Sequence, residues 1–179
     1  MSDNVYLGNP NLKKANTPIE FTEEQIIEFV QCQRDPVYFA NKYVKIVSLD
    51  EGLVPFKPYR FQEKLITNFH ENRFNICKMP RQTGKSTTVV SYLLHYAVFN
   101  DSVNIGILAN KAATARELLG RLQTAYENLP KWMQQGIIAW NKGSLELENG
   151  SKILAASTSA SAVRGMSFNI LFLDEFAFV

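Results

Sequence analysis

The stretch KMPRQTGKSTTV, residues 78–89, decides the expected fold of this chain. It contains Gly84-Lys85-Ser86, the end of the pattern G-x-x-x-x-G-K-[ST]. In that pattern backbone N–H groups surround phosphate oxygens, the lysine reaches the terminal phosphates and the hydroxyl binds Mg²⁺. Met79 replaces the first glycine and Arg81 lies inside the loop. Since such a loop joins a strand to a helix, we expect a strand before it and a helix after it.

The sequence around this loop alternates between short apolar segments and longer segments with helical periodicity. The apolar segments predict buried strands over 73–79, 103–109 and 169–175. Helical periodicity follows the first segment in STTVVSYLLHYAVF. It follows the second in a run whose apolar residues share one side: Leu118, Leu122, Ala125, Tyr126 and Leu129. This alternation indicates an α/β fold with a mostly parallel sheet that is flanked by helices on both faces.

A β-hairpin is expected between the last two apolar segments. In SLELENGSKILAA, apolar and polar residues alternate on either side of Asn149-Gly150, the strongest short hairpin signal. We interpret the hairpin as an insertion.

The residues before the loop divide into two parts. Residues 1–20 are polar with two prolines and predict an extended arm, whereas residues 21–72 predict a helical segment. Thr22 and Gln25 form a capping box, and Asp35-Pro36 ends one helix and begins the next. Residues 73–179 would then form the core around the loop.

Composition excludes several classes of protein. The 179 residues are 46% hydrophobic and 20% charged with a net charge of +2, which is ordinary for a soluble domain. No apolar run has the roughly 18 residues of a membrane span, and a signal peptide is not evident. Cys32 and Cys77 are far apart and lack metal-ligand spacing, so we expect reduced thiols in a cytoplasmic protein without a structural metal.

Two acids follow the last apolar segment. At the end of a strand, Asp174 could hold Mg²⁺ and Glu175 could polarise an attacking water. Acids also mark the places where buried strands meet solvent, so the pair is informative only together with Gly84-Lys85-Ser86.

Arg81 and the pair Phe61-Gln62 are further candidates. An arginine in the loop can stabilise charge on a γ-phosphate; the alternative is a surface residue paired with an acid. Phe61 could stack on adenine and the Gln62 amide could hydrogen-bond it. Such a pair on an amphipathic helix is also typical of one core and one surface residue.

For the histidines, the tryptophans and the other basic residues, we expect roles in packing or on the solvated surface. His70 and His95 lie in helical segments without partners at ligand spacing, and Trp132 and Trp140 are expected to pack. The basic residues of KLITNFHENRFNICK favour a solvated face over contacts with DNA phosphates.

Three longer stretches carry a resemblance to a known family: RQTGKSTTVV, WNKGSLELENGS and SAVRGMSFNILFLDEFAF. With them the chain resembles the ATPase part of the large terminase of T-even-like tailed phages, the motor that packages DNA into capsids. The resemblance runs from about YLGNPNLKKAN to the last residue. It implies a P-loop NTPase fold of the ASCE type, and ATP hydrolysis with Mg²⁺ that drives translocation of double-stranded DNA.

The resemblance also assigns residues. Arg81 is similar to the arginine finger within the loop, Asp174 and Glu175 to the Walker B pair, and Phe61 with Gln62 to the adenine-binding motif. The residues that resemble the phosphate and magnesium contacts of the Walker A loop are Gln82, Thr83, Gly84, Lys85, Ser86 and Thr87. For Arg164-Gly165 the expected role is site coupling or structure.

Partners and location follow from the same resemblance. They are double-stranded DNA, the capsid portal protein, the small terminase subunit and other copies in a homo-oligomeric ring, with no membrane. The expected location is the host cytoplasm on the viral procapsid, and not the mature virion.

The chain departs from the family in length. It ends four residues after Glu175, before the coupling motif, the second ATPase subdomain and the nuclease domain that full-length members contain. We therefore expect a chain truncated after the Walker B strand. Its strands 73–79 and 170–174 either pair directly or leave an open slot with unpaired backbone groups, which implies marginal stability and self-association.

Two alternative functions stay open. A DExx helicase-like ATPase also combines an upstream glutamine with Walker A and B motifs, but its downstream motifs are not reached. A non-catalytic nucleotide-binding or assembly module would share the loop without turnover.

Overall fold

The computed structural model describes residues 4–48, 50–159 and 165–175, and every structural statement below refers to them. The helices are α1 (Glu23–Arg34), α2 (Pro36–Tyr43), α3 (Arg60–Glu71), α4 (Lys85–Phe99) and α5 (Ala112–Glu127). The first four strands are β1 (Val5–Tyr6), β2 (Asn9–Lys13), β3 (Lys45–Ser48) and β4 (Gly52–Pro55). The later strands are β5 (Asn104–Ala109), β6 (Ile137–Trp140), β7 (Ser144–Leu147), β8 (Lys152–Ser157) and β9 (Ile170–Leu173).

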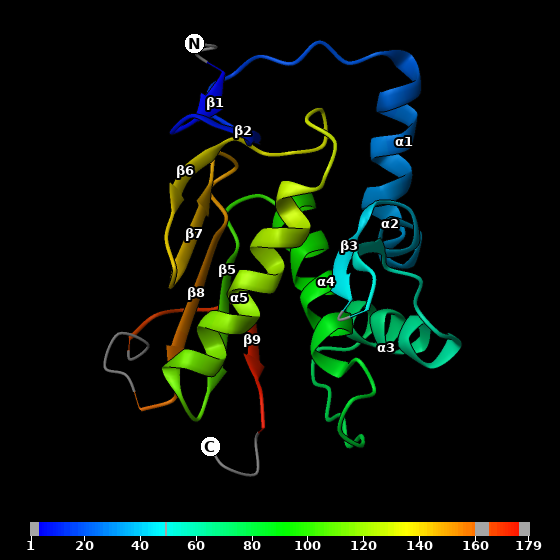
Figure 1. Cartoon of the computed structure of the whole chain (residues 1–179), viewed down its shortest axis with the longest axis vertical. Helices are drawn as coiled ribbons and strands as arrows, with labels where there is room; N and C mark the ends of the chain where they lie inside the picture. Colours follow the sequence, from blue (N-terminus) through cyan, green and yellow to red (C-terminus); the bar gives the residue numbers. More distant parts are fainter. Residues whose placement is uncertain (1–3, 49, 160–164, 176–179) are drawn as a thin grey trace.

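A five-stranded mixed sheet forms the centre of the molecule, with the strand order β6-β7-β8-β5-β9 (Figure 1). β5 pairs in parallel with β8 and β9, whereas β6, β7 and β8 pair antiparallel. The α/β class is therefore confirmed. The sheet is mixed where a mostly parallel one was expected, because the hairpin strands belong to it.

The hairpin predicted around Asn149-Gly150 is present. β7 and β8 pair antiparallel, and Gly150 has φ of +80°, a left-handed conformation that glycine adopts without a steric cost. β8 also pairs with β5 along its whole length, from Asn104 opposite Lys152 to Ala109 opposite Ser157. One arm of the expected insertion is thus a central strand of the sheet.

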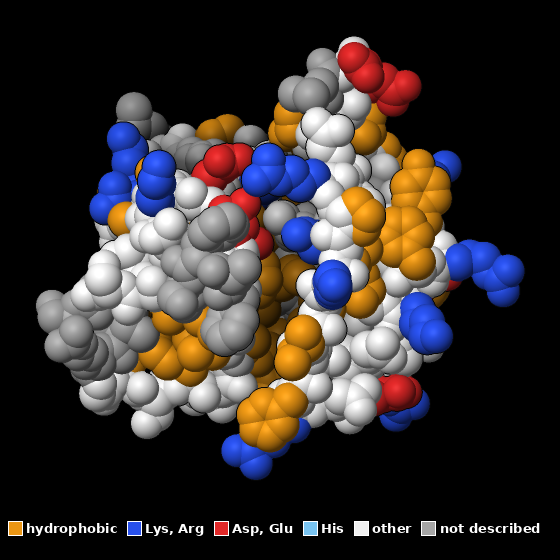
Figure 2. Space-filling model, turned by 90° about the horizontal axis from the view of Figure 1, so that it is seen from below, with side chains coloured by type: hydrophobic (Ala, Val, Ile, Leu, Met, Phe, Trp, Pro, Cys, Tyr) orange, Lys and Arg blue, Asp and Glu red, His pale blue; other side chains and the backbone are white. Residues whose placement is uncertain are grey.

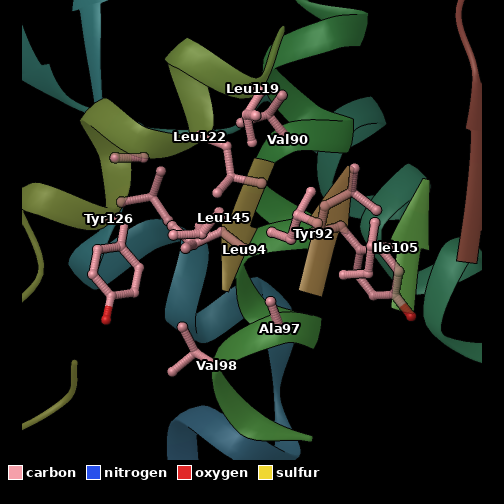
Figure 3. Packing of buried hydrophobic residues seen from close by; sticks show 14 of the residues in the cluster. Val90, Tyr92, Leu94, Ala97, Val98, Ile105, Leu119, Leu122, Tyr126 and Leu145 are labelled. Atoms are coloured by element: carbon pink, nitrogen blue, oxygen red, sulfur yellow. The ribbon is translucent and has the colours of Figure 1, made fainter. Parts of the chain in front are cut away.

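The hydrophobic core lies between one face of the sheet and the helices α4 and α5 (Figure 3). Leu94 of α4, Leu122 of α5 and Ile105 of β5 are completely buried there. On the opposite face, which Gly106 and Leu171 share, the Leu171 side chain is 48% exposed. Helices were expected on both faces, but in the described part of the chain they cover only one.

The N-terminal segment, which we expected to be an extended arm, contains a small hairpin. β1 and β2 pair antiparallel, and Leu12 of β2 is 1% exposed. Lys13 N donates to Gln134 Oε1 at 3.0 Å, and Gln134 Nε2 donates to Asn11 O at 2.9 Å. This hairpin is therefore tied to the segment between α5 and β6.

The expected caps begin the first two helices. Thr22 Oγ1 accepts from Gln25 N at 3.2 Å and Gln25 Oε1 accepts from Thr22 N at 3.1 Å, a reciprocal capping box. Asp35 ends α1, and its carboxylate accepts from the first N–H groups of α2. After α2, the β3–β4 hairpin leads to α3.

The strand expected over 73–79 is not formed. These residues make no ladder with the sheet, and the side chains of Phe74 and Ile76 are 83% and 100% exposed. β9 pairs only with β5 among the described strands, so its other edge is unpaired. An apolar segment becomes a strand only where a neighbour satisfies its backbone groups. Both outcomes weighed above assumed a strand at 73–79, so neither is formed: the segment does not pair with β9, and β9 has one unpaired edge among the described strands.

Candidate nucleotide-binding site

Residues 80–87, here called the phosphate loop, form a tight turn that leads into α4. Gln82 and Gly84 both have left-handed backbones, with φ of 61° and 74°. Thr83 Oγ1 donates to Pro80 O at 3.0 Å, and Thr88 Oγ1 donates to Gly84 O at 2.9 Å. A positive φ at a residue other than glycine is uncommon and concentrates at functional sites. Gln82 is such a residue. The hydrogen bonds of Thr83 and Thr88 and the left-handed Gly84 stabilise the turn around it.

The start of α4 presents unpaired donors. Gly84 is the N-cap, so no side chain caps the first N–H groups, and the first turn contains no acidic residue. Lys85, Ser86 and Thr87 of this turn are half-buried. Free N–H groups at a helix N-terminus together with a lysine favour the binding of an anion such as phosphate.

Gln62 connects α3 to the phosphate loop. It is 4% exposed, its Oε1 accepts from Tyr59 N at 2.9 Å, and its Nε2 donates to Thr83 O at 3.3 Å. The neighbouring ring of Phe61 is 44% exposed and stacks on Tyr59, with centroids 5.9 Å apart and planes inclined by 10°. Two motifs separated by about twenty residues in the sequence are therefore in contact.

A pocket of about 730 Å³ lies beside these residues. Six of the candidate site residues identified from the sequence line this pocket: Phe61, Gln62, Gln82, Thr83, Gly84 and Thr87. The other lining residues come from the β3–β4 hairpin and the segment after it: Ile46, Glu51, Val54, Pro55, Phe56, Lys57 and Tyr59. Sequence reasoning missed this second group, although the aromatic spacing of Tyr59 and Phe61 could have indicated a stacking surface.

The two acids lie at the end of β9. Asp174 N donates to Leu108 O at 2.8 Å, which continues the ladder with β5, and Glu175 has a left-handed backbone with φ of 51°. Parallel strands β5, β8 and β9 all end at the side of the molecule where α4 begins, at the bottom of Figure 1. Figure 2 looks onto this side and shows basic and acidic side chains around a hollow lined by hydrophobic groups. The fold therefore brings the acids and the phosphate loop to one end.

None of the charged candidates is engaged in an ion pair within the described residues. The pairs found there are Lys13–Glu148, Lys42–Glu28, Arg121–Glu117 and Lys152–Glu146. Arg81 is exposed, in the part of the loop that precedes Gln82. Because Arg81, Lys85, Asp174 and Glu175 do not serve these structural pairs, their charges are available to a ligand.

The described residues contain no group of three or more His, Cys, Asp or Glu side chains that could hold a metal ion. A divalent cation at this end would therefore have few protein ligands, with Ser86 and Asp174 as the candidates. Mg²⁺ is usually bound in this way, through one or two protein oxygens, substrate phosphates and water. Arg164 lies outside the described residues, while the adjacent Gly165 is exposed with φ of +83°.

The histidines and tryptophans have the packing or surface roles that we expected. His95 is 2% exposed among aromatic rings and His70 is exposed on α3, while Trp132 and Trp140 pack against the core. Within the described residues, the helices are too short or too polar to cross a membrane.

Comparisons with known proteins bear on the family and the fold of this chain. The family described as "Terminase large subunit, T4likevirus-type, N-terminal" matches residues 76–179, more than half of the chain. The fold is similar to the crystal structure of the HK97 bacteriophage large terminase, with a TM-score of 0.64 and 18% sequence identity. That likeness covers 79% of this chain and 30% of the HK97 chain, so this chain spans less than a third of that protein's length.

Proposed function

This chain belongs to the T4-like family of terminase large subunits, and from that premise we propose that it binds and hydrolyses Mg²⁺–ATP as part of a DNA-packaging motor. The observation that carries the proposal is the placement of the phosphate loop and the Asp174-Glu175 pair at one end of the sheet. The finer fold assignment, an ASCE-type P-loop NTPase, belongs to the same proposal.

The phosphate loop would bind the triphosphate. Its left-handed Gly84 begins α4 without a side-chain cap, which leaves the first N–H groups of the helix for a ligand, and Lys85 adds a positive charge beside them. Gln82 and Thr83 contribute the backbone of the turn, and Thr87 lines the adjoining pocket. These donors match a ligand with several negative oxygens.

Ser86 and Asp174 would hold Mg²⁺, which supplies charge neutralisation at the transferred phosphoryl group when it is bound. Glu175 would accept a proton from the attacking water, and Arg81 would stabilise charge on the terminal phosphate oxygens. In the described residues neither side chain has an ion-pair partner, which supports these roles.

The pocket beside Phe61 would receive the base. Phe61 and Tyr59 offer exposed ring surface, and apolar residues of the β3–β4 hairpin also line the pocket. A purine can stack on such rings with little dependence on its identity.

The partners that we propose are those of the family: double-stranded DNA, the capsid portal protein, the small terminase subunit and further copies in a ring. The proposed location is the host cytoplasm on the procapsid. The activity proposed for the whole motor would need parts of the protein beyond the length that this chain spans.

Calorimetric titration of the chain with a non-hydrolysable Mg²⁺–ATP analogue tests the binding step. Lys85→Ala should weaken binding at least tenfold, because a charge-assisted contact is worth about 1.5–3 kcal/mol. Lys14→Ala is the matched control, since Lys14 is an exposed lysine on the N-terminal segment, next to β2. Equal affinity in the Lys85→Ala variant and the wild type would contradict the proposal.

Phosphate release from ATP tests the chemical step. Glu175→Gln should abolish turnover while leaving the analogue bound, whereas Glu24→Gln on exposed α1 should change neither. Equal background rates in the wild type and the Glu175→Gln variant would instead favour a module that binds nucleotide without hydrolysing it.

A further inference from the structure

We propose that Glu51 binds the ribose hydroxyls of the nucleotide, so that the pocket prefers a ribonucleotide to a deoxyribonucleotide. The inference rests on the proposed nucleotide-binding function and adds a sugar contact to the phosphate and base contacts described above. Three observations carry it: the place of Glu51 in the pocket, the hairpin that holds it there, and the chemistry of the groups that share the pocket with it.

Glu51 is the only carboxylate among the described residues that line the pocket. It directly precedes β4, it is exposed, and the four ion pairs found in the described part of the chain do not include it. An ionised carboxylate has two oxygens that accept hydrogen bonds and no donor. Glu51 is therefore suited to a part of the ligand that donates.

The β3–β4 hairpin fixes the position of this carboxylate. At the base of the hairpin Phe56 N donates to Val44 O at 2.8 Å, and both residues are buried. At the turn, Ser48 Oγ accepts from Asp50 N at 3.3 Å and from Glu51 N at 3.4 Å. The backbone of Glu51 is thus held by a turn at the end of an element that is anchored in the core.

One face of the hairpin belongs to the pocket. Ile46 and Val54 are opposite each other in the ladder, and both line the pocket. The next pair in the ladder, Val47 and Leu53, is 67% and 47% exposed, because successive residues of a strand point to opposite faces. The hairpin therefore adds an apolar face and one acid to the pocket that the phosphate loop also lines, and its volume of about 730 Å³ suits a ligand of nucleotide size.

The ribose hydroxyls are the donors of a nucleotide that fit this acid best. The ionised triphosphate has no donor, and its charge repels a carboxylate. The base is served by the rings of Tyr59 and Phe61 and by the Gln62 amide. That amide keeps one N–H and one lone pair beyond its bonds to the protein. The 2′- and 3′-hydroxyls then remain for Glu51, and an acidic side chain also binds the ribose in dinucleotide-binding folds.

The test compares nucleotides that differ only in the sugar. Calorimetry with Mg²⁺ would measure the affinities of a non-hydrolysable ATP analogue, of its 2′-deoxy and 3′-deoxy forms, and of inorganic tripolyphosphate. The wild type should bind the ribonucleotide about three- to tenfold more tightly than either deoxy form, because each deoxy form lacks one hydrogen bond to the carboxylate. Glu51→Ala should bind the ribonucleotide more weakly and lose the preference, whereas its affinity for tripolyphosphate should not fall, because a repelling charge has been removed.

Asp50→Ala is the matched control. Asp50 is the neighbouring acid, it is exposed, and its N–H donates to the same Ser48 Oγ, but it is not among the residues that line the pocket. The two variants remove the same charge from the same turn, so a general effect on charge or on the turn would appear in both. Only Glu51→Ala should abolish the preference for the ribonucleotide.

Three results would overturn the inference while nucleotide binding itself is still observed. Equal wild-type affinities for the ribonucleotide and both deoxy forms would mean that the pocket ignores the hydroxyls. A preference that persists in Glu51→Ala would assign the hydroxyls to another group. A loss in Glu51→Ala that is equal for all three nucleotides would place the carboxylate at the base. A wild type that binds none of the ligands would contradict the proposed function together with the inference.

Discussion

His95 on α4 is a buried residue whose charge state affects stability. Its ring lies 4.9 Å from that of Phe99 and 5.5 Å from that of Phe39, and its Nε2 is 2.9 Å from Cys32 O. A neutral ring with a proton on Nε2 therefore joins α4 to α1. Burial is the largest effect and lowers the pKa of His95 to about 4, although the hydrogen bond to Cys32 raises this pKa in part. Of the weaker effects, His70 lowers the pKa and Asp35 raises it.

We predict that the folded state loses stability between pH 6.5 and pH 4 because of His95. In the unfolded chain His95 binds a proton near pH 6.5, whereas in the folded chain it stays neutral down to about pH 4. Above pH 6.5 the protonation of His95 therefore does not lower the free energy of unfolding, and between pH 6.5 and pH 4 it lowers this free energy by about 3 kcal/mol. Urea unfolding at a series of pH values measures it. His95→Gln should flatten this part of the profile and His70→Gln should not; the same slope in both variants would contradict the assignment.

At the scale of elements, Glu148 fastens the N-terminal hairpin to the sheet. Its carboxylate accepts from Asn16 N at 2.8 Å and Gly136 N at 2.6 Å, and it pairs with Lys13 Nζ at 2.6 Å. Burial raises the pKa of Glu148, but the contacts from Lys13, Asn16 and Gly136 outweigh it and lower the pKa below its usual range. The ionised carboxylate thus joins β2 to the segment before β6 and the turn after β7.

Glu148→Gln should therefore release the hairpin. An amide cannot accept from all three donors, and the cost should be about 1–3 kcal/mol in urea unfolding. Trypsin should then cleave faster after Lys13 and Lys14. Glu146→Gln is the control, because the Glu146–Lys152 pair is more exposed and should contribute less than about 1 kcal/mol. Unchanged cleavage in Glu148→Gln would show that the hairpin is held by packing alone.

At the scale of the whole molecule, the described residues include both exposed apolar side chains and an unpaired strand edge. Ile76 is fully exposed and Phe74 is 83% exposed in the segment before the phosphate loop, while β9 is paired only with β5 among the described strands. Figure 2 shows the hollow at this end of the molecule. Exposed strand edges and apolar side chains promote association between molecules.

We predict that Ile76→Ser reduces self-association without a loss of stability. A fully exposed side chain contributes within about 0.5 kcal/mol to unfolding, but it adds apolar surface to an interface between copies. Sedimentation velocity over a range of concentrations measures the change. Ile27→Ser, at a 71% exposed position on α1, should leave association unchanged. A wild-type chain that stays monomeric throughout would contradict the prediction.

The sequence determined those features that depend on neighbours in the chain. The caps at Thr22 and Asp35, the turn at Gly150, the start of α4 after Gly84 and the buried strand β5 are local patterns of backbone preference and apolar periodicity, and all are present. The candidate site residues were found in the same way, from motifs with fixed spacing.

Only the tertiary structure decided how distant segments satisfy one another. Residues 73–79 have the composition of a strand but form none, because a strand depends on a neighbour to pair its backbone, and apolarity alone cannot supply one. The N-terminal hairpin forms because Gln134 and Glu148, more than a hundred residues away, accept its donors. Gln62 is held for the same reason, because its partner at Thr83 becomes a neighbour only after the chain has folded.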